Sequence, residues 1–139
     1  VAGLMAILRD DKTDNDVRGR IADALGNIGD VSIVAGLMAI LRDDKTDNDV
    51  RGSIADALGN IGDVSIVAGL MKMADDVKSD IWNYIVQTIV NLANTKEHCE
   101  WLLKLHSKGI NNDTLHSILY QVSRRAGVVI CRDGKVLDA

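Results

Sequence analysis

The protein has 139 residues, of which 47% are apolar, 26% are charged and only 3% are aromatic, with neither Pro nor Phe. This size suits one domain, the net charge of −4 argues against a nucleic-acid-binding surface, and no apolar run approaches the ~20 residues of a membrane span. The two cysteines, Cys99 and Cys131, fit a reducing compartment better than a disulfide framework, so we expect a cytoplasmic protein.

The first half of the chain is one sequence written twice. Val1–Ile33 recurs as Val34–Ile66 with a single difference, Arg20 in the first copy and Ser53 in the second, and a degraded third copy begins at Val67. Self-similarity at a fixed period is typical of stacked-repeat proteins. A short repeat cannot bury its apolar face alone, so we expect the copies to stack.

Each copy predicts two helices. Ile33–Leu41 is apolar on every side, which predicts a first helix that is buried all round. Asp30 and Asp63 are the expected N-caps of these first helices. The acidic loop DDKTDN follows, and then a second helix from about Asp49 to Asn60.

The second helix carries one core stripe and ends at glycine. Apolar residues recur at helical spacing, and Gly62 is the expected C-terminal signal. The stripe consists of Val50, Ile54, Ala57, Leu58 and Ile61.

The third copy aligns only if its loop is two residues shorter. Ile81, Ile85, Ile89 and Leu92 then match the core stripe, and Trp82, Tyr84, Val86 and Val90 replace Arg51, Ser53, Ala55 and Gly59. The added apolar bulk predicts that regular stacking ends here. We expect a different partner, the helix at about Lys96–His106 with Trp101, Leu102 and Leu105, to pack at this end.

The C-terminal segment after about residue 112 no longer follows the repeat pattern. Asp113 or Asn112 is the expected cap of a helix Thr114–Ala126, whose core positions are Leu115, Ile118, Leu119 and Val122 and which ends at Gly127. The segment VVICRDGKVL predicts a β-hairpin with Asp133-Gly134 as its tight turn, lying on the preceding helix because a lone hairpin is marginal.

These elements predict an all-α fold, an α-solenoid of the HEAT/armadillo-like kind with a small C-terminal helix plus β-hairpin cap. We expect a repeat array over 1–94, with repeats at about 1–33, 34–66 and 67–94, and a capping region over 95–139. Because Val1 matches Val34, which lies inside a predicted helix, we expect the chain to start within an element of a longer array whose N-terminal face lacks a cap.

The run DxDVRxxIADALGNIGD resembles the short HEAT-like repeats of the phycobilisome-lyase type, over about 1–94. The matching residues are Asp14, Val17, Arg18 and Ala22–Asp30, and Asp47, Val50, Arg51 and Ala55–Asp63. The resemblance implies that Asp14, Arg18, Asp47 and Arg51 tie successive repeats together in a hydrogen-bonded ladder. Trp82 breaks that pattern.

The tail TLHSILYQVSRRAGVVICRDGKVL is similar to the C-terminus of bacterial proteins that join a NACHT-type signalling NTPase to such repeats. The resemblance implies a larger parent protein. No G-x-x-x-x-G-K-[ST] motif is present, so an NTPase would lie upstream of this sequence.

No pattern in the sequence indicates a reaction, cofactor or metal. An EF-hand reading of the acidic loop fails, because Arg51 and Leu58 stand where oxygen ligands are needed. His98 and Cys99 would point apart on a helix, and Cys99 and His106 would lie roughly 10 Å apart. The histidines and cysteines lack the spacing of a zinc site.

One polar stripe on the second helices, off the core face, is the candidate binding surface. The only position that differs between the first two copies, Arg20 versus Ser53, lies on it, and the third copy has Tyr84 there. The alternative is that this position varies because it is exposed and unconstrained. Stacking aligns such stripes into a continuous surface. Its members are Asp16, Arg20, Asp23 and Asn27, then Asp49, Ser53, Asp56 and Asn60, then Asp80, Tyr84, Gln87 and Asn91.

We therefore predict a non-enzymatic protein–protein interaction scaffold, the C-terminal repeat module of a larger cytoplasmic NACHT-like signalling protein. Its expected partners are another protein or upstream domains of the parent, without nucleic acid or membrane, and self-association through the uncapped first repeat is a further option. The alternative is a bilin-lyase-like subunit that binds a tetrapyrrole, which the visible spectrum of an added bilin would reveal. A bare structural spacer is a third reading.

Overall fold

The computed structural model describes residues 1–76, 81–105 and 110–139, which form two compact units, Val1–Leu92 and Ala93–Ala139. None of the described helices is long and apolar enough to cross a membrane.

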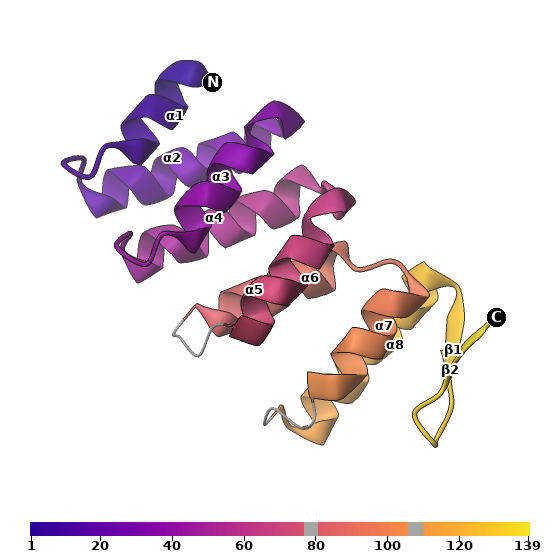
Figure 1. Ribbon diagram of the computed structural model, residues 1–139. Helices are drawn as coiled ribbons and strands as arrows, with labels where there is room; N and C mark the ends of the chain where they lie inside the picture. Colours follow the sequence, from indigo (N-terminus) through magenta and orange to yellow (C-terminus); the bar gives the residue numbers. More distant parts are fainter. Residues whose placement is uncertain (77–80, 106–109) are drawn as a thin grey trace. The chain divides into compact units, whose positions relative to one another are not determined.

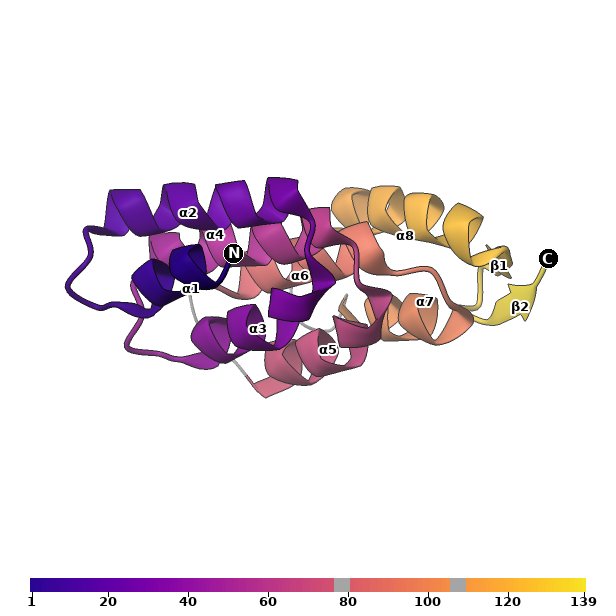
Figure 2. The ribbon, with the colours of Figure 1, turned by 90° about the horizontal axis from the view of Figure 1, so that it is seen from above.

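The first unit consists of three helical hairpins. The first helices are α1 (Ala2–Arg9), α3 (Val34–Arg42) and α5 (Val67–Asp76), and the second helices are α2 (Asn15–Ile28), α4 (Asn48–Ile61) and α6 (Trp82–Leu92). Figures 1 and 2 show the first helices forming one layer of this unit and the second helices the other. The α-solenoid predicted from the repeat is confirmed.

Local signals in the sequence set the helix ends. The side chains of Asp14 and Asp47 accept backbone hydrogen bonds at the starts of α2 and α4, and Gly29 and Gly62 end these helices with φ of 72° and 78°. Asp30 and Asp63 act as caps as expected, but of the short 3-10 helices Val31–Ile33 and Val64–Ile66, which lead directly into α3 and α5.

The core lies between the two layers of helices. The largest side chains that are fully buried in the first two hairpins are Leu8, Leu25, Leu37, Leu41, Ile54 and Leu58. The prediction that the first helix is buried all round is wrong in part: Val34, Leu37, Met38, Ile40 and Leu41 are buried, but Ala35 and Ala39 are exposed. The partner helix α4 and the neighbouring first helices cover only part of the surface of α3. Its remaining side is exposed, and the alanines there leave little apolar area in water.

The third hairpin keeps the core pattern of the others. Ile81, Ile85, Ile89 and Leu92 are buried at the positions that the shortened loop assigns to them. The expected stripe member Asp80 lies outside the described residues, as does the loop around it.

The second unit comprises α7 (Lys96–Leu103), α8 (Asn112–Ala126) and the antiparallel strands β1 (Val128–Ile130) and β2 (Val136–Asp138). Thr95 caps α7, and Gly127 ends α8 with φ of 65°. The hairpin packs against α7 and α8 and buries Val128 and Val136. The predicted end of α7 at His106 lies outside the described residues.

Two local predictions in this unit are wrong by one or two residues. Asn111, rather than Asn112 or Asp113, caps α8, because its Oδ1 accepts a 2.8 Å hydrogen bond from the Thr114 N–H. The hairpin turn closes through a 3.0 Å bond from the Gly134 N–H to the Cys131 carbonyl, so Arg132 and Asp133 are its central residues. Gly134, with φ of 84°, supplies the left-handed residue that follows such a turn.

Candidate functional site

Neighbouring repeats approach each other closely at glycines inside the second helices. A Cβ added to Gly26 of α2 would lie 2.9 Å from the Cα of Ala57 in α4, and one added to Gly52 of α4 would meet the ring of Tyr84 at 2.9 Å. Glycine in a helix costs roughly 1 kcal/mol relative to alanine, so its recurrence inside these helices needs a reason. Close packing of successive second helices is that reason at Gly26 and Gly52.

The first helices make the corresponding contact through methionine and arginine. The ends of the Met5 and Arg9 side chains lie against Gly36, and those of Met38 and Arg42 lie against Gly69. A hydrogen bond adds to the contact between the later repeats, because Thr88 Oγ1 of α6 lies 2.9 Å from the Ala55 carbonyl oxygen of α4. Sequence reasoning missed these residues, although the recurrence of glycine inside two copies of a helix was a usable signal.

The polar stripe lies along the exposed side of the three second helices. The helices α2, α4 and α6 lie side by side in one layer (Figure 2), so each carries its stripe members next to those of the neighbouring repeat. Between α2 and α4 the surface is hollowed by about 370 Å³, lined in part by Arg20, Asp23 and Ser53. The described stripe members that are exposed are Asp16, Arg20, Asp23, Asn27, Asp49, Asp56, Asn60, Tyr84, Gln87 and Asn91, and Ser53 is half-buried.

One stripe position differs between the repeats, and its side chain, Ser53 in the second repeat and Tyr84 in the third, also contacts the preceding repeat. A Cβ on Gly19 would lie 3.4 Å from Ser53 Oγ, and the Tyr84 ring lies directly over Gly52. Tyr84 nevertheless keeps 38% of its surface exposed. The side chain at this position therefore decides how the groove between two second helices is filled, and the glycine beneath it leaves room for Tyr as well as Ser.

Two carboxylates from neighbouring repeats affect each other on this stripe. Partial burial raises the pKa of Asp56 above its ordinary value of 3.8, and the negative charge of Asp23 raises this pKa further. Ionisation of Asp56 is thus less favourable in the folded protein than in the unfolded chain.

Replacing Asp56 with Asn should therefore change the pH dependence of stability. A carboxyl whose pKa is raised by folding destabilises the protein at neutral pH, and this destabilisation disappears as the pH falls through the raised pKa towards 3.8. We expect Asp56→Asn to gain at most about 0.5 kcal/mol at pH 7, because the group is largely exposed, and to gain almost nothing at about pH 3, below both the folded and the unfolded pKa. Urea denaturation at both pH values measures this difference, and Asp23→Asn should give part of it. Equal gains at both pH values would contradict the assignment.

The four residues expected to form a ladder make hydrogen bonds inside their own repeats. Arg18 Nε donates to the Leu8 carbonyl and Arg51 Nε to the Leu41 carbonyl, each at 2.9 Å, and both guanidinium groups are buried. Asp14 and Asp47 accept from the backbone at the starts of α2 and α4. The two arginine bonds join the second helix to the end of the first helix of the same hairpin, and the two aspartate bonds cap the second helix itself. A ladder between successive repeats stays a prediction.

The carboxylates of the acidic loops also bind backbone. Asp10 Oδ1 accepts from the Lys12 N–H and Asp43 Oδ1 from the Lys45 N–H, each at 3.0 Å. Over residues 1–76, 81–105 and 110–139, no group of three or more His, Cys, Asp or Glu side chains is arranged to hold a metal ion. These loops are ordered turns closed by their own side chains.

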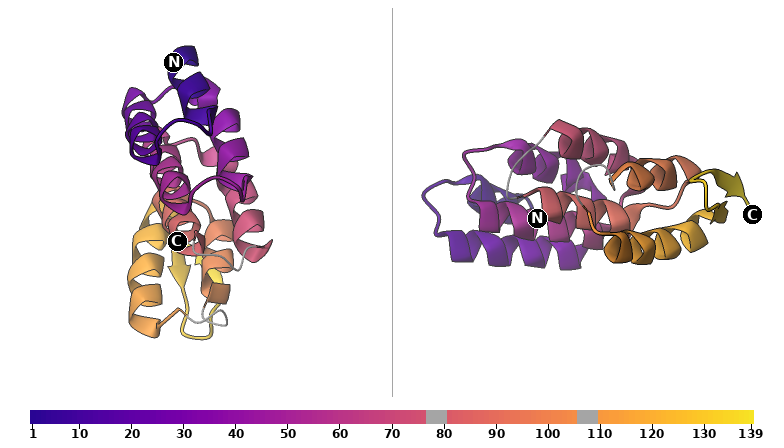
Figure 3. Two further views of the ribbon diagram at one scale, coloured as in Figure 1. Left: turned by 90° about the vertical axis from the view of Figure 1, so that its left-hand side faces the viewer. Right: turned by 90° about the horizontal axis from the view of Figure 1, so that it is seen from below.

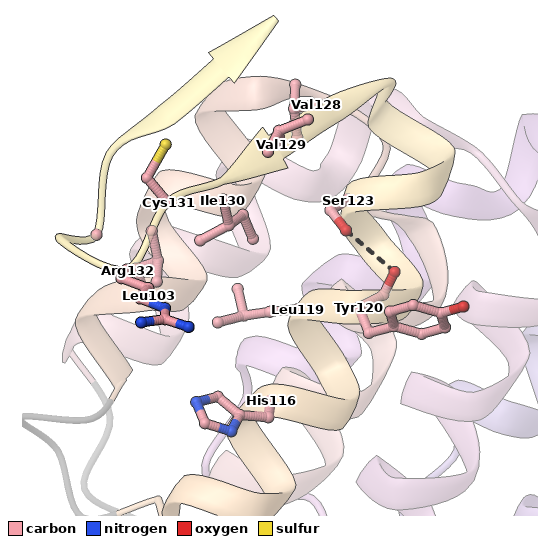
Figure 4. A pocket seen from close by; sticks show the side chains of 11 residues that line it. Leu103, His116, Leu119, Tyr120, Ser123, Val128, Val129, Ile130, Cys131 and Arg132 are labelled. Atoms are coloured by element: carbon pink, nitrogen blue, oxygen red, sulfur yellow. Dashed lines mark hydrogen bonds between the residues drawn. The ribbon is translucent and has the colours of Figure 1, made fainter. Parts of the chain in front are cut away.

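The second unit has an open groove of about 550 Å³ between α8 and the hairpin (Figure 4). Leu103, Leu119 and Ile130 form part of its lining, and His116 and Arg132 are at one end. The sulfur of Cys131 points away from His116 in this view, so the two do not form a nucleophile–base pair. Burial lowers the pKa of His98 and raises that of the Cys99 thiol, which favours the neutral form of both side chains.

A comparison with protein families matches residues 1–89 to HEAT repeats. No curated protein matches the chain. The matched residues include the three hairpins up to the last turn of α6.

Proposed function

This chain belongs to the HEAT-repeat family, and we propose that it is a non-enzymatic scaffold whose second helices bind a protein partner. HEAT repeats generally mediate protein–protein interaction. The observation that supports the proposal is the exposure of the polar stripe members on α2, α4 and α6. The hairpins do not need this stripe to form their core.

The charges and the aromatic ring of the polar stripe suggest the kind of partner. Asp23 and Asp56 repel each other, so a Lys or Arg side chain placed between them would relieve the repulsion. Tyr84 offers a half-exposed ring held on a glycine, and aromatic side chains of this kind are common anchors of interfaces. We infer a partner that presents basic side chains beside an apolar group.

Site-specific photo-crosslinking tests this surface. A photoreactive residue at Gln87, on the stripe, should capture a partner from the source cells, whereas one at exposed Ala35 of α3, in the other layer, should not. The double change Asp23→Lys and Asp56→Lys should abolish capture at Gln87 while circular dichroism at 222 nm is unchanged. Equal capture at Gln87 and Ala35, or capture that survives the charge reversal, would contradict the proposal.

We also infer that the array is the C-terminal module of a larger cytoplasmic signalling protein of the NACHT type. The similarity of the tail from Thr114 onwards supports this inference. The coding sequence immediately upstream of Val1 tests it, since a P-loop motif and further repeats are expected there. The bilin-lyase alternative depends on the family resemblance alone, and an unchanged visible spectrum of added bilin would remove it.

A further inference from the structure

The small sheet of the second unit has one free edge, along β1. The Cys131 N–H donates to the Lys135 carbonyl at 2.8 Å, so these two residues form a hydrogen-bonded pair of the β-hairpin. Only alternate residues of an antiparallel pair are bonded across it. The backbone N–H and C=O groups of Val128 and Ile130 therefore point away from β2. Among the described residues, no further strand pairs with this edge.

The free edge of β1 borders the groove between α8 and the β-hairpin. Four consecutive residues, Val128 to Cys131, line this groove, and Leu119 and Ser123 of α8 line it from the other side (Figure 4). The side chains of a strand alternate between two faces, so an unbroken run of lining residues means that the edge of the strand faces the groove. The β-hairpin lies beside α7 and α8 (Figures 1 and 3), and these helices hold the groove open.

The groove combines an apolar floor with a cationic end. Leu119 is buried in the floor, and Leu103 and Ile130 are half-buried beside it. Arg132 and His116 lie at the end next to the hairpin turn. None of the described residues that line the groove is Asp or Glu. The groove therefore suits a ligand that is apolar along its length and negatively charged at one end.

The guanidinium of Arg132 is available to such a ligand. The carboxylate next to it in the sequence, that of Asp133, is already in use: its Oδ1 accepts a 3.1 Å hydrogen bond from the Lys135 N–H, and its Oδ2 lies 3.6 Å from Lys135 Nζ. Over the part of the chain that the structure describes, no carboxylate pairs with Arg132, which is exposed. Arginine binds carboxylates through short, charge-assisted hydrogen bonds.

We propose that this groove binds an extended acidic peptide, which adds as a third strand to the free edge of β1. The backbone of the peptide bonds to the outward N–H and C=O groups of Val128 and Ile130. Its apolar side chains, at alternate positions, face Leu119, and a Glu or Asp at one end pairs with Arg132. In strand addition of this kind, main-chain bonds supply affinity and the side-chain contacts supply specificity. The site lies in a different unit from the polar stripe and does not depend on it.

A second copy of this chain fits the groove less well than an acidic peptide. Pairing of two β1 strands would bring the segment VVICR of the copy to the groove, and this segment holds no acidic side chain. It would add a further arginine where the groove already has Arg132. A charged side chain beside a short strand is one of the features that keep free edges of identical chains apart.

Titration of the ¹⁵N-labelled 139-residue protein with the capped peptide acetyl-SVTVTE-amide, followed by NMR, tests the proposal. This peptide has apolar side chains at alternate positions and its only charge at one end. When about nine-tenths of the protein is bound, amide hydrogen exchange at Val128 and Ile130 should slow about tenfold, because both N–H groups become paired. Their proton resonances should move downfield by more than that of Val129, which already bonds to β2.

Two substitutions in the hairpin turn are matched controls. Arg132→Gln and Lys135→Gln each remove one exposed positive charge, but only Arg132 lines the groove. Arg132→Gln should weaken binding of the peptide about tenfold, and Lys135→Gln by less than about twofold. The peptide with Gln in place of its Glu should also bind about tenfold more weakly, and Arg132→Gln should then cost no further affinity.

Four results would overturn the proposal. The first is the absence of resonance shifts at up to about 1 mM peptide. The second is binding that leaves exchange at Val128 and Ile130 unchanged, because the groove would then hold the side chains of a ligand without strand addition. The third is equal weakening by the two Gln substitutions, which would show attraction by net charge alone. The fourth is exchange at these amides that slows with rising protein concentration in the absence of peptide, which would assign the edge to a second copy.

Discussion

Gly26→Ala is expected to destabilise the protein, although alanine is the better helix former. The added Cβ would lie 2.9 Å from the Cα of Ala57 and 3.1 Å from its Cβ, and a backbone atom cannot move aside as a side-chain end can. Overpacking of this kind typically costs 1–3 kcal/mol, which exceeds the helix-propensity gain of roughly 1 kcal/mol. We therefore expect a net loss of up to about 2 kcal/mol in the free energy of unfolding, measured by urea denaturation followed at 222 nm.

The second copy contains the matched control. Gly59 stands in the same local sequence as Gly26, but a Cβ there would meet its nearest atom, Asn91 Nδ2, at an ordinary 3.5 Å. Gly59→Ala should therefore stabilise the protein by about 0.5–1 kcal/mol. The two substitutions are identical in type and local sequence. If Gly26→Ala lowers the free energy of unfolding and Gly59→Ala raises it, the contact between repeats decides the outcome. Stabilisation by both would contradict the close approach of α2 and α4.

Arg51→Ala should have the largest effect among the charged residues of the array. Its guanidinium is buried, and its Nε donates to the Leu41 carbonyl, which closes α4 onto the end of α3. Hydrogen bonds of charged groups contribute about 1.5–3 kcal/mol, and the buried stem adds packing, so we expect a loss of about 2–4 kcal/mol. Denaturation with urea measures this loss.

Arg20→Ala is the control for this substitution. Arg20 lies on the exposed stripe, and surface substitutions of this kind usually change stability by less than about 0.5 kcal/mol. Arg51→Lys should recover little of the stability, since lysine has a point charge in place of the Nε donor. Similar losses for Arg20→Ala and Arg51→Ala would show that the buried hydrogen bond is not the source of the effect.

The polar stripe, the candidate binding surface, could be predicted only in part from the sequence. Helical spacing placed Arg20, Asp23 and Asn27 on one side of a helix, away from the core, and the structure has these residues exposed. The spacing could not show that position 53 lies near Gly19, or that Tyr84 covers Gly52. Those contacts depend on the distance between two helices, which a periodic pattern does not contain. Whether the stripe binds a partner stays a prediction.

The sequence by itself determined the repeat, the two helices of each hairpin, the ends of the second helices and the apolar side of each helix. These features follow from local chemistry, namely capping side chains, left-handed glycines and the spacing of apolar residues. Only the tertiary structure decided which side chains of each copy are buried. It places Ile40 and Val50 in the core while Ile7 and Val17 remain at the surface, because burial depends on the neighbouring hairpin and not on the residue itself. Identical sequences therefore form unlike surfaces within one protein.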